Sequence, residues 1–129
     1  MLDRHVKSSF PSLGLTIKHV RDATDIWYAR LFGTPIEGSE EGIGSLLNVS
    51  VAMNDKVQGL DDEGLNQVIS YANLKGDKFK QPCWQLLMHC FNHSSYHRGQ
   101  LITLMHQLDL REIPNTDLVS YQRLLMAGR

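Results

Sequence analysis

The sequence has few cysteines, no long apolar run and no excess of charge of either sign, and each absence excludes a class of protein. Two cysteines, Cys83 and Cys90, are too few for a disulfide scaffold, so we expect a reduced, cytoplasmic chain. Apolar runs of only a few residues exclude a transmembrane helix, and residues 1–7 lack the apolar core of a secretory signal. A formal net charge of -1 gives no attraction for nucleic acid or an anionic membrane.

The length and composition indicate one folded domain over residues 1–129. A chain of 129 residues is long enough for a single core and too short for two typical domains. Hydrophobic residues make up 42% and charged residues 21%, which is the balance of a globular chain rather than a disordered one.

Apolar spacing and Gly or Pro boundaries predict an all-α antiparallel bundle with a short β-hairpin. Helices are expected over residues 11–32, 45–59 and 82–108, with a last helix that begins near 115–117 and ends near 125. The predicted hairpin spans 66–80, Asp61–Glu63 is expected in a solvated turn, and the glycine-rich stretch 38–44 is expected to form a loop. Core packing is expected for Trp27, Trp84, Met88, Met105 and Cys90, and a structural role for Cys83.

Two of the six histidines, His93 and His97, are spaced for metal binding. Four residues apart on a helix, they lie on one face with Cβ atoms ~6 Å apart, so both imidazoles can reach one ion. Two ligands are insufficient, and His19 is the strongest candidate for a third because it lies on another predicted helix. Without further information, two histidines at this spacing are more often a solvated or buried pair than a metal site.

The other histidines are weaker candidates. His5 is close to the N-terminus, and His106 is expected to face away because it follows His97 by nine residues. His89 is one turn before His93, and we expect it to contact the ligands from outside or to lie in the core. No Glu adjoins either helical ligand, which disfavours a metallopeptidase of the His-Glu-x-x-His type.

The run from Asn92 to Gln100, Asn-His-Ser-Ser-Tyr-His-Arg-Gly-Gln, closely resembles the core motif of the DinB-like damage-inducible family. The run from Ser9 to Val20 resembles the earlier helix of that family, which carries its first metal histidine, and the resemblance covers the chain from about residue 9 onward. It implies a four-helix up-down-down-up bundle with His19, His93 and His97 as ligands of a divalent transition metal, most often zinc or nickel. Family members have a complete helix before the segment that matches Ser9, where this chain has eight residues. Two alternatives follow: the chain is a truncated or misassigned form, or that helix is absent and another surface covers its groove.

The resemblance implies a metal-dependent thiol S-transferase or a related detoxification or stress enzyme, with a low-molecular-weight thiol and a small molecule as substrates. A metal-dependent hydrolase and a non-enzymatic stress protein with a structural metal remain alternatives. Three ligands leave an open coordination position, which is the pattern of a catalytic metal site.

Three residues of the motif receive separate expectations. Arg98 is expected to pair with a carboxylate or to hold an anionic substrate, and Gln100 to hydrogen-bond a ligand ring or a metal-bound group. Gly99 is expected to allow close approach of another helix. A homodimer is predicted, because apolar stripes on two helices need a cover (Leu13, Ile17 and Val20; Leu101, Leu104 and Leu108).

Overall fold

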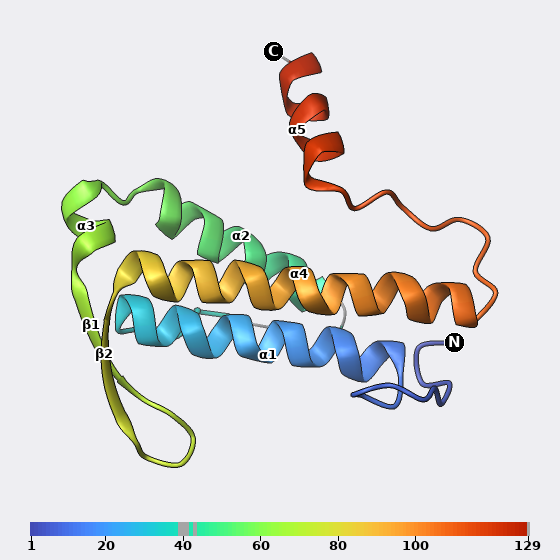
Figure 1. Ribbon diagram of the computed structural model, residues 1–129, viewed down its shortest axis with the longest axis horizontal. Helices are drawn as coiled ribbons and strands as arrows, with labels where there is room; N and C mark the ends of the chain where they lie inside the picture. The colour runs from blue at the N-terminus through green and yellow to red at the C-terminus, as the bar shows by residue number, and fades with distance from the viewer. Residues whose placement is uncertain (39–41, 43, 129) are drawn as a thin grey trace.

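The computed structural model describes residues 1–38, 42 and 44–128, and this part of the chain is mostly helical (Figure 1). Residues 39–41 and 43 of the predicted glycine-rich loop lie outside the described residues. The elements follow one another as α1 Leu13–Phe32, α2 Gly44–Gln58, α3 Asp62–Asn66, β1 Val68–Ala72, β2 Lys78–Pro82, α4 Cys83–Gln107 and α5 Leu118–Ala127.

The two helices that carry the candidate ligands, α1 and α4, have ends that the sequence explains. Ser12 caps α1, since its side chain accepts a hydrogen bond from the Leu15 backbone N–H at 3.2 Å. Gly33 ends α1 in the left-handed conformation with φ 75°, and its N–H donates to the Ala29 carbonyl. Pro82 stands at the N-terminal cap position of α4 rather than inside it. The bounds of both predicted helices are confirmed to within two residues.

Helix α1 packs on α4 and on α2, and two groups of buried apolar side chains hold these three helices together. The larger group includes Tyr28, Met53 and Leu86 and lies toward the hairpin. The smaller group joins Val6, Leu13, Leu104 and Leu108 near the chain's N-terminus. Leu13 of one predicted stripe therefore packs with Leu101, Leu104 and Leu108 of the other within one chain, so these side chains do not need a second copy to cover them.

The predicted hairpin is confirmed as two antiparallel strands, displaced by about two residues toward α4. Ser70 pairs with Lys80 at the centre of the ladder, and Asn73 and Asp77 close the turn through a backbone hydrogen bond of 2.9 Å. The acidic stretch before it is not a simple turn. Asp61 caps α3 by accepting from the Gly64 N–H at 2.8 Å, so these acidic side chains begin a short helix.

The four-helix bundle is not confirmed. Helix α5 forms as predicted, but it stands apart from the other helices in Figure 1 and none of its residues is buried. Residues 1–12 form turns and bends beside the start of α1. The described chain is therefore a three-helix core of α1, α2 and α4, with the hairpin and α3 at one end.

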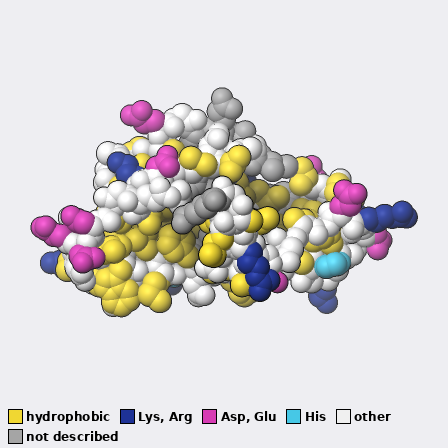
Figure 2. Space-filling model, turned by 90° about the horizontal axis from the view of Figure 1, so that it is seen from above, with side chains coloured by type: hydrophobic (Ala, Val, Ile, Leu, Met, Phe, Trp, Pro, Cys, Tyr) yellow, Lys and Arg dark blue, Asp and Glu magenta, His cyan; other side chains and the backbone are white. Residues whose placement is uncertain are grey.

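Large apolar side chains remain on the surface. Trp84 and Met88 are 42% and 63% exposed, so their predicted place in the core was wrong, whereas Trp27 and Met105 pack partly buried against the core as expected. Figure 2 shows hydrophobic side chains on the outer face, gathered mainly toward the hairpin end. No helix in the described chain is long and apolar enough to span a bilayer.

Candidate metal centre

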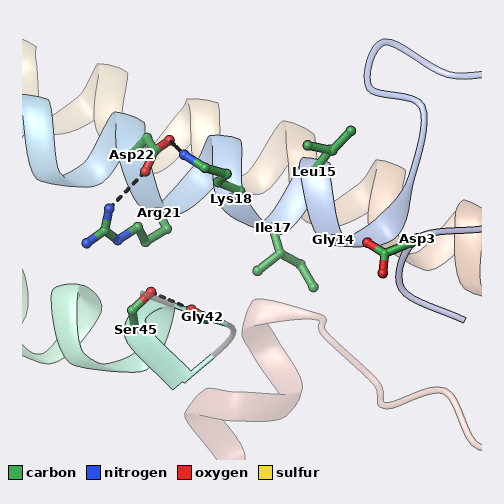
Figure 3. Close-up of a pocket in the computed structure, with 9 residues that line it drawn as sticks. All are labelled: Asp3, Gly14, Leu15, Ile17, Lys18, Arg21, Asp22, Gly42 and Ser45. Carbon is green, nitrogen blue, oxygen red and sulfur yellow. Dashed lines mark hydrogen bonds and ion pairs between the residues drawn. The ribbon is translucent and has the colours of Figure 1, made fainter. Parts of the chain in front are cut away.

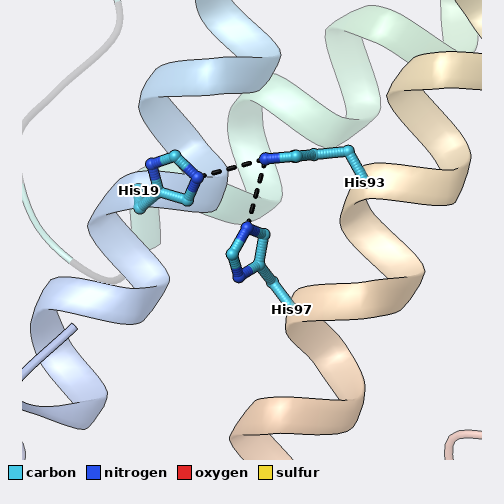
Figure 4. Close-up of side chains that lie close together, drawn as sticks. All are labelled: His19, His93 and His97. Carbon is cyan, nitrogen blue, oxygen red and sulfur yellow. Dashed lines mark hydrogen bonds between the residues drawn. The ribbon is translucent and has the colours of Figure 1, made fainter. Parts of the chain in front are cut away.

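The fold brings His19 of α1 against His93 and His97 of α4 (Figure 4). The Nε2 atom of His93 lies 3.1 Å from the Nε2 atom of His19 and 3.1 Å from that of His97. The three ligand atoms lie within 4.8 Å of one another, although His19 and His93 are 74 residues apart in the chain. The packing of α1 on α4 thus assembles the three histidines that the sequence singled out.

Two of the three nitrogen pairs have the spacing that a transition metal requires. Ligands at Zn–N distances of about 2.0–2.1 Å in tetrahedral geometry are ~3.4 Å apart, close to the two observed separations. Hydrogen bonding alone does not account for the cluster. The Nε2 atom of His93 carries at most one hydrogen and faces two other Nε2 atoms, so it cannot donate fully to both. A shared cation satisfies all three lone pairs at once.

The environment of the site favours neutral imidazoles, which are the form that binds a metal. Burial, followed by the nearby His97, lowers the pKa of His19, with Asp22 acting in the opposite direction. Burial also lowers the pKa of His93, and the neighbouring His97, His19 and His89 add to the effect. His97 itself is only 5% exposed.

Gln100 fixes the orientation of His97. Its amide oxygen lies 2.7 Å from His97 Nδ1 and cannot donate, so Nδ1 carries the hydrogen and Nε2 presents its lone pair to the cluster. The Gln100 amide nitrogen donates to the Ser9 hydroxyl at 3.2 Å and lies 3.4 Å from the Tyr96 hydroxyl. The contact with a ligand ring that the sequence predicted for Gln100 is therefore present.

Phe10 is the neighbour of the site that sequence reasoning missed. Its ring stacks on that of His19 with centroids 4.3 Å apart, and it meets the His97 ring at 5.9 Å. Phe10 precedes the N-terminal cap of α1, so no helical spacing relates it to His19. The sequence therefore holds no periodic signal for this contact.

The other predicted residues lie at or beyond the edge of the cluster. His89 is exposed and packs edge-on against Trp27 at 5.0 Å, so it does not lie in the core. Of its two predicted roles, the one outside the ligands stays a prediction, and its ring centroid is 6.0 Å from that of His93. Arg98 is exposed, and among the described residues its side chain donates to Ser95 at 3.3 Å. His106 is exposed and faces away as predicted.

The two cysteines and the cavity between α1 and the start of α2 are separate from the histidines. Burial raises the pKa of Cys83 and raises that of Cys90 to about 12, so both are unreactive thiols, as expected for packing residues. A cavity of about 340 Å³ lies between α1 and the start of α2, and the ion pairs of Asp22 with Lys18 and Arg21 lie on its α1 wall (Figure 3). Within the described ranges, none of the three histidines lines this cavity.

Comparison with known proteins gives the family of the chain. The sequence matches the family described as the DinB family over residues 1–125. Neither the curated proteins nor the solved structures gave a match. Because the match covers nearly the whole chain and includes all three histidines of the cluster, the chain belongs to the DinB family.

Proposed function

We propose that His19, His93 and His97 bind one divalent transition metal, zinc or nickel, and that the protein is a metal-dependent thiol S-transferase of the detoxification type. The observation that carries the proposal is the convergence of three Nε2 atoms, two pairs of them at 3.1 Å, with the His97 tautomer held by Gln100. Neutral nitrogen donors favour zinc, nickel, iron or copper over magnesium or calcium.

Three protein ligands support a catalytic rather than a structural metal. Structural zinc is held by four protein ligands, whereas catalytic sites keep a position open for water or substrate. The two helices that carry the ligands are already joined by buried apolar side chains such as Leu13 and Leu104, so the core does not depend on a metal to bring them together. A bound metal supplies a Lewis acid that stabilises the thiolate form of a thiol.

The nucleophilic thiol of this reaction has to come from a co-substrate. Cys90 is 7% exposed with its pKa raised to about 12, and Cys83 is 2% exposed. Neither thiol can serve as a nucleophile at neutral pH, because the thiolate is the reactive form. A low-molecular-weight thiol that reaches the metal from solution fits the site, and an electrophilic small molecule is then the second substrate.

The test is metal analysis of untreated protein, followed by optical spectra of a cobalt-substituted form with and without thiols. We expect one metal per chain and a change of the cobalt bands when a thiol is added. The His97→Ala variant should lose the metal, and the His106→Ala variant, which removes an exposed histidine from the same helix, should retain it.

The same experiment distinguishes the alternatives. Bound metal with cobalt bands that no thiol changes would reject the transferase and leave a structural metal. Bands that respond to anions and not to thiols would favour the hydrolase. Protein that neither contains nor takes up a metal would reject the metal site itself.

The proposal also includes a cytoplasmic location and a homodimer. A reducing compartment fits two cysteines that both remain free thiols. The exposed apolar side chains of α5, among them Leu124 at 71% and Met126 at 75%, give a dimer a different surface from the one expected from the sequence. Light scattering at micromolar concentration tests this point, and a monomer would contradict it.

A further inference from the structure

The segment before α1 forms a closed loop that reaches the metal centre. We name residues 6–11 the N-terminal loop. The Val6 backbone N–H donates to the Pro11 carbonyl at 2.9 Å and closes the loop, while the Val6 side chain is buried beside Leu13 and Leu104. The Gly14 N–H donates to the Leu2 carbonyl at 2.9 Å, which ties the preceding residues to the first turn of α1. The loop is therefore fixed at both ends.

Two consecutive residues of this loop contact the metal centre in different ways. Phe10 stacks on the His19 ring with an interplanar angle of 25° and meets the His97 ring edge-on at 62°. Ser9 accepts a hydrogen bond from the amide of Gln100, whose oxygen holds His97 Nδ1. One loop thus contacts the α1 ligand directly and supports an α4 ligand through one intermediate side chain.

We infer that the N-terminal loop is part of the metal centre and that Phe10 is a positioning residue for the ligands. A His ring turns about its terminal torsion with only broad preferences, so Nε2 meets the metal only when neighbours fix the ring plane. A flat aromatic face against the His19 ring fixes that plane. The hydrogen bond to Ser9 keeps Gln100 in the rotamer in which it accepts from His97.

This inference concerns the orientation of the ligand rings. It rests on the proposed metal site but not on the thiol reaction. A purely apolar cover would act through buried area alone, and Leu supplies most of that area. A positioning role requires a flat ring. Phe10→Leu and Phe10→Tyr therefore separate the two roles, because Tyr keeps the ring and Leu does not.

The experiment measures cobalt and zinc dissociation constants by competition with a chromophoric chelator, together with the cobalt spectrum of each variant. We expect Phe10→Leu to weaken binding about 10–100-fold, the usual effect of removing a group that orients a ligand, and to alter the cobalt bands. Phe10→Tyr should bind like the unaltered protein. Ser9→Ala should weaken binding less than Phe10→Leu, because it removes an indirect support. Phe91→Leu is the matched control, since Phe91 is a 51% exposed aromatic on α4.

Melting temperatures of the metal-free variants show whether each one folds. If Phe10→Leu does not fold, the affinity and cobalt spectrum of Ser9→Ala decide the matter. Unchanged metal affinity and cobalt bands in a folded Phe10→Leu variant would overturn the inference. If Phe10→Leu is unfolded, the same result in Ser9→Ala would overturn it. Equal losses of affinity in Phe10→Leu and Phe10→Tyr would also overturn it. Failure of the unaltered protein to bind either metal would overturn it together with the proposed function. Normal metal binding without any thiol response would reject only the transferase.

Discussion

Replacing Gly99 by Ala is expected to stabilise the protein, which reverses the expectation drawn from the sequence. Gly99 lies inside α4, where glycine costs about 0.8–1.0 kcal/mol relative to alanine because of its backbone entropy. A Cβ atom built at Gly99 meets no atom of a neighbouring element within 4 Å. The close approach of another helix that the sequence predicted is absent from the described chain, so the methyl group brings the propensity gain without a steric penalty.

The expected gain is large enough to measure. For a chain of this size, 1 kcal/mol corresponds to a shift in melting temperature of ~3–5 °C. Gly99→Ala should therefore melt about 3–5 °C higher in calorimetry or in a circular-dichroism melt at 222 nm, the ordinary wavelength for helix. Gly33→Ala is the matched control, because Gly33 adopts φ 75° at the end of α1 and alanine there should cost about 1–2 kcal/mol.

Destabilisation by Gly99→Ala would refute this reasoning. It would mean that another surface packs against this face of α4 in solution, as the sequence led us to expect. Repeating the melt over a range of protein concentrations would then identify that surface. A dependence on concentration would indicate a second copy of the chain, and its absence would indicate a segment of the same chain.

Three further predictions follow from the histidines and cysteines. Removing the metal with a chelator should lower the melting temperature by ~8–13 °C, since ligand at 100 times its dissociation constant contributes about 2.7 kcal/mol, and His106→Ala should leave this difference unchanged. Metal-free protein should lose stability as the pH falls below about 6.5. The lowered pKa values of His19 and His93 mean that the unfolded chain binds more protons there, and urea titrations at pH 5 and about 7.5 check this. A thiol reagent should modify Cys90 only under denaturing conditions, because its buried thiol has a pKa of about 12, and mass spectrometry measures the labelling.

Features that depend on local spacing could be predicted from the sequence. The cap at Ser12 and the left-handed Gly33 delimit α1, and both residue types are strong helix-end signals. The pair His93 and His97 could be placed on one helix face because residues i and i+4 are neighbours on the same face of an α-helix. His19 could be proposed as a third ligand because it lies on another predicted helix, and the family resemblance strengthened that choice, since no spacing rule relates residues 74 apart.

Features that depend on which faces meet could not be predicted. Trp84 and Met88 have large apolar side chains that are typical of a core, yet they lie on the face of α4 turned away from α1 and α2 and remain exposed. Helix α5 has apolar residues at core-like positions, and all of them are exposed because the segment that follows α4 leads it away from the other helices. Apolar content alone therefore did not determine burial in this chain.

The difference between Gly99 and Phe10 explains why the candidate site was only partly predictable. Both lie in segments that resemble the family, and a resemblance indicates that a residue type suits its place without giving the physical reason. Gly99 was assigned to helix packing, but its surroundings are open. Phe10 received no role, but its ring lies against His19, one of the three clustered histidines. In each case the reason depends on a contact across elements, so the candidate ligands and Gln100 could be inferred from the motif, whereas the contact of Phe10 with His19 appears only in the fold.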